Sequence, residues 1–410
     1  MNNPLLDLLS QASVSFLLLI GLVSFLSIRR PISVRASTFI RKPATEVFAI
    51  VDFAPGSQAW HRGEATIRVL DPGKDIYRVT YTTLSPGSAD HISEADFQVI
   101  DRTPPSHLMA IRHGLGRRVT NQLLKLDAKV ADEPGGSRLT LQYDWGPRSL
   151  LAQILARMDL RASLDRIKSV AETGKVDHSR ESRMAVIVAI ATGALSVLAF
   201  GLWLGWYSAA LLILVLSFHE LGHLVAFRMI GQPWGRILFI PFLGALAVPR
   251  LPFRNEFEHA FAALMGPGFS LLLLLAGFVL GLLDIPHAGQ LIFVTALING
   301  LNLLPVLPLD GGHAVQSILQ SFFPKNIRAG LTVCAILIAA ASFFTMKPIL
   351  LAVALIAAFG ASYGERRAAH SRVPMSITTG VVTALAMIAM GVIYGGILHW
   401  GFEIRPSITS

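Results

Sequence analysis

The sequence of 410 residues is 53% apolar and only 15% charged, a composition that excludes a water-soluble protein and predicts an integral membrane protein. The net charge of +9 does not indicate nucleic-acid binding, because the basic residues lie mostly beside apolar runs, as topology signals do. The single cysteine, Cys334, excludes an intramolecular disulfide and a cysteine metal site.

The first apolar run, residues 13–27, is followed at once by Arg29 and Arg30. A secretory signal carries its positive charge before the apolar region, whereas here the charge comes after it. Residues 1–31 are therefore expected to be an uncleaved transmembrane anchor whose N-terminus lies outside. The segment that follows is then cytoplasmic.

Residues 32–176 have the composition of a soluble α+β domain. A strand at 34–40 and a short helix opened by Pro43 precede six strand-like runs, and an amphipathic helix at 150–172 closes the segment. This order, and above all the opening VRASTFIRKPATEVFAIVDFAPGSQAWH with Trp60, resembles the START-like, polyketide-cyclase-type helix-grip fold. The resemblance implies a sheet wrapped around the long helix, with either an apolar ligand cavity or a filled core between them.

Seven further apolar runs follow a basic stretch, so with the anchor we expect about eight transmembrane helices. The fold class is therefore a polytopic α-helical membrane protein with an inserted helix-grip domain. We expect a metal-binding core at 185–325 and C-terminal transmembrane helices at 326–410. The runs cover residues 185–204, 207–229, 257–283, 289–307, 329–345, 348–363 and 376–399.

Charges fit one orientation of these spans. Arginine and lysine gather in the loops assigned to the inside, and tryptophan lies at the assigned outer ends, at Trp203, Trp206 and Trp400. The soluble domain is then cytoplasmic. We expect the protein to lie in a bacterial inner (plasma) membrane.

One of these spans contains the motif HELGH. His219 and His223 are four residues apart, so on a helix both imidazoles lie on one face and can share one metal ion, with Glu220 beside them. Imidazole suits Zn²⁺, and a catalytic zinc site adds a third protein ligand and a water that a carboxylate can deprotonate. A charged residue at mid-membrane costs at least roughly 2.5–3.5 kcal/mol, which argues against a merely structural histidine pair.

The third ligand should lie at the same depth, towards the cytoplasmic face, where Glu256, His259, Asp310 and His313 are the candidates. Asp310 is preferred, because Pro305 and Pro308 break the preceding helix and Gly311 and Gly312 permit close backbone approach. Asp310 is also suited to capping the next helix, a role compatible with ligation.

Three motifs in order, HELGH, AALMGPG at 262–268 and NLLPVLPLDGG at 302–312, resemble the site-2 protease family of intramembrane zinc metalloproteases. The resemblance implies zinc bound by His219, His223 and Asp310, Glu220 as the general base, and Asn302 near the reacting carbonyl. Ser270 stands where many members have asparagine, and no PDZ- or CBS-like segment is evident, which leaves the mode of substrate selection open.

The apolar, proline-interrupted run GRILFIPFLGALAVP at 235–249 is too broken to span the membrane. It resembles the family's membrane-embedded strand segment, whose edge would pair with an unwound substrate; the alternative is an interfacial loop. Phe239, Pro241 and Gly244 are the candidate substrate-binding residues.

These features together predict a zinc endopeptidase that cleaves a single-span membrane protein near its cytoplasmic side. The START-like domain would regulate the enzyme or recruit substrate, with a lipid or other apolar molecule as its ligand. The alternative from a different class is a catalytically inactive, lipid-binding membrane sensor. The intact Glu220 and the complete ligand set argue against that alternative.

Overall fold

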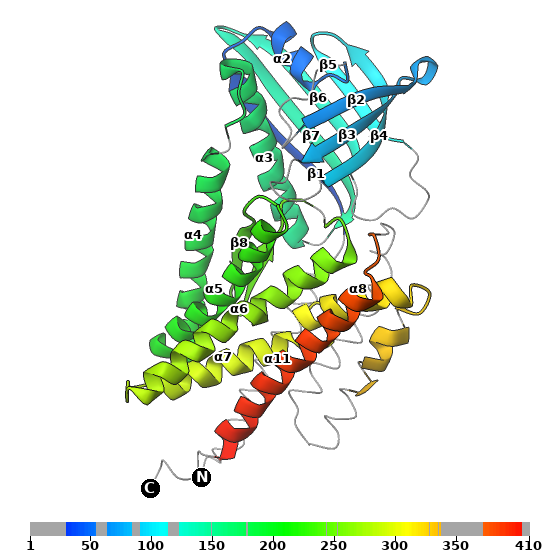
Figure 1. The fold of residues 1–410 in the computed structure, drawn as a ribbon. Coiled ribbons are helices and arrows are strands. Elements are labelled where there is room, and N and C mark those ends of the chain that lie inside the picture. Colours follow the sequence, from blue (N-terminus) through cyan, green and yellow to red (C-terminus); the bar gives the residue numbers. More distant parts are fainter. Residues whose placement is uncertain are drawn as a thin grey trace, which may run out of the picture. The chain divides into compact units, whose positions relative to one another are not determined.

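The computed structural model describes residues 30–54, 64–83, 91–113, 123–148, 150–177, 179–242, 244–251, 253–327, 329–334, 336–337 and 372–403. The chain divides into two compact units, residues 1–184 and 185–410, each of which is described by itself (Figure 1). The predicted anchor at residues 1–31 lies, apart from its last two residues, outside the described part.

The first unit is a seven-stranded antiparallel sheet with two helices, α2 (Ala44–Val51) and α3 (Leu150–Thr173). Strands β2 to β7 follow one another across the sheet, and β1 closes the order by pairing with β7, Ser33 opposite Asp144 and Ser37 opposite Thr140. Helix α3 lies along β1 and β7 (Figure 1). The predicted helix-grip order is therefore confirmed. The strands are β1 (Arg30–Ile40), β2 (Glu64–Asp71), β3 (Ile76–Thr83), β4 (His91–Thr103), β5 (His107–Arg112), β6 (Leu123–Glu133) and β7 (Gly136–Arg148).

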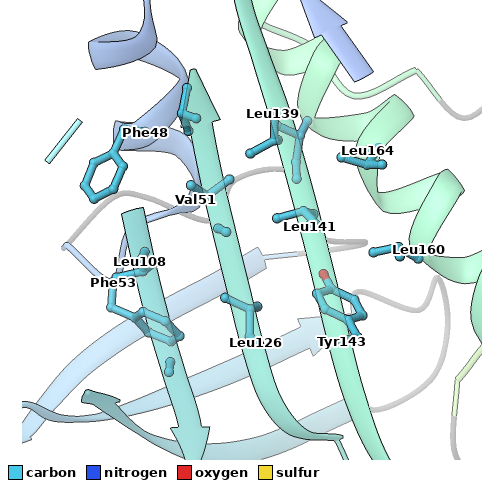
Figure 2. Packing of buried hydrophobic residues seen from close by; sticks show 14 of the residues in the cluster. Phe48, Val51, Phe53, Leu108, Leu126, Leu139, Leu141, Tyr143, Leu160 and Leu164 are labelled. Atoms are coloured by element: carbon cyan, nitrogen blue, oxygen red, sulfur yellow. The ribbon is translucent and has the colours of Figure 1, made fainter. Parts of the chain in front are cut away.

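The core of this unit is filled from both helices and from the sheet. Figure 2 shows Phe48 and Val51 of α2 and Leu160 and Leu164 of α3 around the same strands, and because α2 also contacts α3, their side chains belong to one cluster. Leu139 and Leu141 of β7 are almost completely buried. Alternate residues of β7 thus face one continuous apolar layer, as the period of two in a strand requires.

A small polar cluster lies within this core. The Tyr143 hydroxyl is hydrogen-bonded with Ser163 of α3, and Arg166 Nη2 donates to Ser163 Oγ over 3.1 Å. Burial raises the pKa of Tyr143 to about 12, so its phenol stays neutral at physiological pH. The predicted apolar ligand cavity stays a prediction.

The second unit consists of helices and one short hairpin. Its elements are α4 (Ser179–Leu204, which begins in the first unit), α5 (Trp206–Met229), β8 (Arg236–Ile240), β9 (Gly244–Val248), α6 (Glu256–Leu282), α7 (Ala288–Asn302), α8 (Asp310–Phe322) and α11 (Ile377–Glu403). Among the described residues, four helices are long and apolar enough to span a membrane: Ser182–Leu204, Trp206–Met229, Glu256–Leu282 and Ile377–His399. This supports a membrane protein and matches four predicted spans.

The fifth apolar helix is shorter than expected. The span predicted at residues 289–307 is helical only to Asn302, and 15 residues rise about 22 Å, less than the roughly 30 Å of a bilayer core. Pro305 explains the early end, because it has no amide to donate and disfavours helical geometry at Leu304. The spans predicted at 329–345 and 348–363 lie largely or wholly outside the described residues, so the total of eight stays a prediction.

Helix α6 is the element against which the others pack. A side chain at Gly222 of α5 would place its Cβ only 2.3 Å from the Met265 carbonyl oxygen, so the glycine of HELGH lets α5 approach α6 closely. Pro267 lies inside α6, and the hydroxyl of buried Tyr394 in α11 donates to the Pro267 carbonyl over 2.6 Å. Helices α7 and α8 also contact α6.

Candidate metal centre

Three side chains predicted as metal ligands converge at the junction of α5 and α8. His219 Nε2 lies 3.1 Å from His223 Nε2 and 2.9 Å from Asp310 Oδ2, and His223 Nε2 lies 3.4 Å from the same oxygen. The three potential ligand atoms all lie within 4.8 Å of one another. Both histidines are buried, so a cation bound here would be largely shielded from solvent.

The partners of the two rings determine which nitrogens carry protons. His223 Nδ1 lies 2.7 Å from the Ala262 carbonyl oxygen, which can only accept a hydrogen bond. His219 Nδ1 lies 2.8 Å from Asn299 Oδ1, while Asn299 Nδ2 donates to the Thr295 carbonyl over 2.8 Å, which fixes the orientation of the amide. Both Nδ1 atoms must therefore be donors. In neutral imidazoles this leaves both Nε2 atoms as unprotonated lone pairs.

With both Nε2 atoms unprotonated, this arrangement favours a bound cation. Two nitrogen lone pairs face each other at 3.1 Å, and the nearby Asp310 Oδ2 is buried and accepts no hydrogen bond from the described residues. Without a positive charge between them these three atoms repel one another. Two imidazole nitrogens and one carboxylate oxygen form the donor set of many catalytic zinc sites, so the residues present fit zinc.

Glycines in the two neighbouring motifs provide the space. A Cβ on Gly266 of α6 would lie 2.4 Å from His223 Nε2 and 2.8 Å from His219 Nε2. On Gly311 and Gly312 it would lie 2.1 Å from the Leu303 carbonyl oxygen and 2.3 Å from the Val306 carbonyl carbon. The first glycine leaves room for the ring nitrogens, and the other two let α8 start beside the end of α7, which places Asp310 at the site.

Glu220 lies next to the predicted ligands, and a backbone group of the hairpin binds its carboxylate. The Ala247 backbone of β9 hydrogen-bonds to its carboxylate. Its Oε2 atom is buried and has no hydrogen-bond partner among the described residues. One carboxylate oxygen is thus oriented while the other is left to accept a proton.

The remaining predicted site residues lie at the end of α7 and in the hairpin β8–β9. Asn302 is the last residue of α7 and is partly exposed, one turn beyond Asn299. The predicted strand segment 235–249 contains the antiparallel hairpin β8–β9, and whether it lies within the membrane or at the interface stays a prediction. Phe239 lies in β8, Pro241 in the turn and Gly244 at the start of β9, with φ of 109°. Their contact with a substrate stays a prediction.

Sequence reasoning missed Asn299, which is fully buried and contacts a predicted ligand. A signal was present, because an amide in the middle of an apolar span is costly unless it has a partner. The motif-based reading instead selected Asn302, one helical turn further on.

In comparisons with known proteins, no family model matches the chain. A curated relative, a zinc metalloprotease from Methanocaldococcus jannaschii, is 27% identical over 170 residues, 38% of this chain and 48% of the relative. The chain thus spans about half the length of that relative.

Solved structures with low similarity fall into two groups. The site-2 protease from Methanocaldococcus jannaschii has 20% identity and a TM-score of 0.31, covering 46% of this chain and 90% of that chain. The di-domain ARO/CYC protein BexL has 18% identity and a TM-score of 0.26, covering 35% and 50%. The AHSA1-like protein from Aeromonas hydrophila has 17% identity and a TM-score of 0.27, covering 36% and 96%.

The curated relative supports the resemblance to zinc metalloproteases, and the order of strands and helices in the first unit agrees with the helix-grip resemblance. The membrane unit is similar to zinc metalloproteases of the site-2 type, and the first unit resembles START-like, cyclase-type domains. The chain combines the two in one polypeptide.

The contact of Gly266 with both rings gives a test of the metal centre. Gly266→Ala should lower zinc content at least tenfold, because the new methyl group occupies the space beside both Nε2 atoms. Gly268→Ala is the matched control, since its Cβ would meet only Met390 Sδ, at an ordinary 3.7 Å. Zinc is measured by elemental analysis of the purified proteins. Equal zinc in the two variants would contradict the assignment.

Proposed function

We propose that the protein is an intramembrane zinc endopeptidase that cleaves single-span membrane proteins near the cytoplasmic face. The observation that carries the proposal is the convergence of two imidazole nitrogens and a buried carboxylate oxygen, with Glu220 beside them. Both histidines and Glu220 lie on α5, which is long enough to span a membrane, and Asp310 begins the shorter helix α8. A site that only stabilised the fold would have no need for a second carboxylate with a free oxygen.

In this proposal, His219 Nε2, His223 Nε2 and Asp310 would hold the zinc ion. When bound there, zinc supplies Lewis-acid polarisation of the scissile carbonyl and of the attacking water. Glu220 takes a proton from that water as the water oxygen bonds to the carbonyl carbon. It then returns a proton to the amide nitrogen as the C–N bond breaks. The Ala247 backbone keeps the carboxylate oriented for both transfers. Asn302 is proposed to donate to the developing oxyanion, as the family resemblance implies.

The hairpin has one edge that is suited to bind substrate. The Phe239 amide donates to Thr192 Oγ1 of α4 over 3.2 Å and therefore points away from β9. Phe239 pairs with Ala245 and Ile237 with Ala247, so by the alternation of antiparallel pairs the backbone groups of Ala245 and Ala247 point away from β8. The hydrogen bond between Ala247 and Glu220 agrees with this direction. The outer edge of β9 thus lies beside the proposed base.

We propose that substrate adds to this outer edge of β9 as an extended strand. A transmembrane helix hides its carbonyls in internal hydrogen bonds, so it must unwind before hydrolysis. Strand pairing replaces those lost bonds and presents a carbonyl at the site. The β8 edge is less suited to this role, because Thr192 already occupies the Phe239 amide.

Replacing the base tests the chemistry. Glu220→Gln should keep zinc but lower cleavage by about 10²- to 10⁴-fold, because only the proton-transfer group is lost. The substrates are identified by comparing membrane proteins from cells with the native and variant proteins. His223→Ala should lower zinc content as well. Native rates of cleavage by the Glu220→Gln protein would exclude Glu220 as the base and favour the inactive sensor.

Proline at the outer edge tests strand addition. Ala245→Pro removes an amide that points away from β8, so cleavage should fall at least tenfold, through a higher KM, while zinc content stays native. Ala245→Val keeps the amide and should lose far less activity. If both variants cleave equally well, the substrate does not pair with this edge.

We further propose that the START-like domain is cytoplasmic and regulates access to the site. Its last helix, α3, continues into a connection that Ser169 and Thr173 hold by hydrogen bonds to the Lys175 carbonyl, of 2.7 and 3.2 Å. Helix α4 then contacts the hairpin through Thr192 and through Phe200, whose ring lies 5.8 Å from that of Phe242. A ligand that favoured one position of α4 by about 1.4 kcal/mol would change access tenfold. We also propose that a lipid or other apolar molecule is the ligand of this domain.

Cysteine labelling tests this placement in a Cys334→Ala background. A cysteine replacing exposed Lys175 should react with an impermeant reagent only after the inner membrane is opened, and one replacing exposed Pro286 should react beforehand. The reverse pattern would put the domain outside. It would also contradict a cytoplasmic cleavage position.

A further inference from the structure

Asn299 is a buried polar side chain that the proposed chemistry does not use directly. It lies in the last turn of α7 and is fully buried. Its two polar atoms have different partners, His219 Nδ1 at 2.8 Å and the Thr295 carbonyl at 2.8 Å. Because a carbonyl can only accept, the amide has a single orientation, with Oδ1 towards the imidazole.

We propose that Asn299 is a positioning residue that keeps His219 in the tautomer able to bind metal. This rests on the zinc site proposed above. The two histidines differ in how their tautomer is fixed: His223 uses a backbone carbonyl, of Ala262, whereas His219 depends on a side chain from a different helix. The tautomer of His219 is therefore the one that a single substitution can change.

A competing arrangement explains why the acceptor matters. His219 Nε2 lies only 2.9 Å from Asp310 Oδ2, a suitable distance for a hydrogen bond. If the proton were on Nε2, His219 would donate to Asp310, and two of the three metal ligands would satisfy each other without a metal. Oδ1 of Asn299 disfavours this state, because a proton on Nε2 would leave Nδ1 and Oδ1 as two facing acceptors, both buried.

The position of Asn299 also links α7 to the metal. Helix α7 supplies no predicted ligand among its described residues, yet through this amide it sets the direction of the His219 ring on α5. Substitutions of the partner that orients a metal-bound histidine typically cost about 10- to 100-fold in metal affinity. The same range is expected here.

The test compares two substitutions at one buried position in the purified full-length protein. Asn299→Leu has nearly the same shape but no acceptor, so its zinc affinity should fall about 10- to 100-fold. Asn299→Asp keeps an acceptor towards Nδ1 and, when protonated on the oxygen that faces the Thr295 carbonyl, still donates to that carbonyl, so its affinity should stay within a few-fold of native. Thr295→Val is the matched control one turn earlier, because it removes a buried hydroxyl that has no hydrogen-bond partner among the described residues and keeps the carbonyl.

Affinity is measured by competition with a chromophoric chelator, and the geometry of the site by the visible absorption of the Co²⁺-loaded proteins. The Asp variant should show a native-like cobalt spectrum, while the Leu variant should show a shifted or weakened one. Native affinity of Asn299→Leu, or an equal loss in both variants, would overturn the proposal. A native protein that binds no zinc would instead refute the proposed metal site itself.

Discussion

The membrane unit is built around one constraint: three electron-rich atoms are held close together and away from water, where they repel one another. With both Nε2 atoms unprotonated, two imidazole lone pairs 3.1 Å apart and a carboxylate oxygen repel one another in a low dielectric unless a cation lies between them. Every close contact around them serves this convergence. Gly222 brings α5 onto α6, Gly266 leaves room for the rings, and Gly311 and Gly312 place the start of α8 beside the end of α7.

Helix α6 contributes no metal ligand but shapes the site most. It provides the carbonyl of Ala262 to His223, the bare backbone at Gly266, and the surface against which α5, α7 and α8 pack. Pro267 leaves the carbonyl one turn earlier without its helical donor, and its own carbonyl is bound by Tyr394. The AALMGPG motif is therefore a structural requirement of the histidine pair on the neighbouring helix.

Much of this could be predicted from the sequence because the decisive signals are local. The spacing within HELGH places both histidines on one face of a helix. The order of strands and helices in the first unit can be predicted from the periodicity of its apolar residues. The contact between Asn299 and His219 and the outer edge of β9 could not be predicted in the same way. Each depends on which neighbour a backbone or side-chain group meets across helices, as the Thr192 hydroxyl meets the Phe239 amide.

The proposed strand addition to β9 has a consequence for which proteins would be substrates. An edge of five residues, about 17 Å long, would bind through peptide amides and carbonyls, which every polypeptide has in common. Recognition of this kind cannot distinguish one amino-acid sequence from another. Substrates would then be selected by how readily their transmembrane helix unwinds at the depth of the site. Glycine, proline or β-branched residues near that depth would favour cleavage. Substrates of such an enzyme would share a physical weakness in place of a consensus motif.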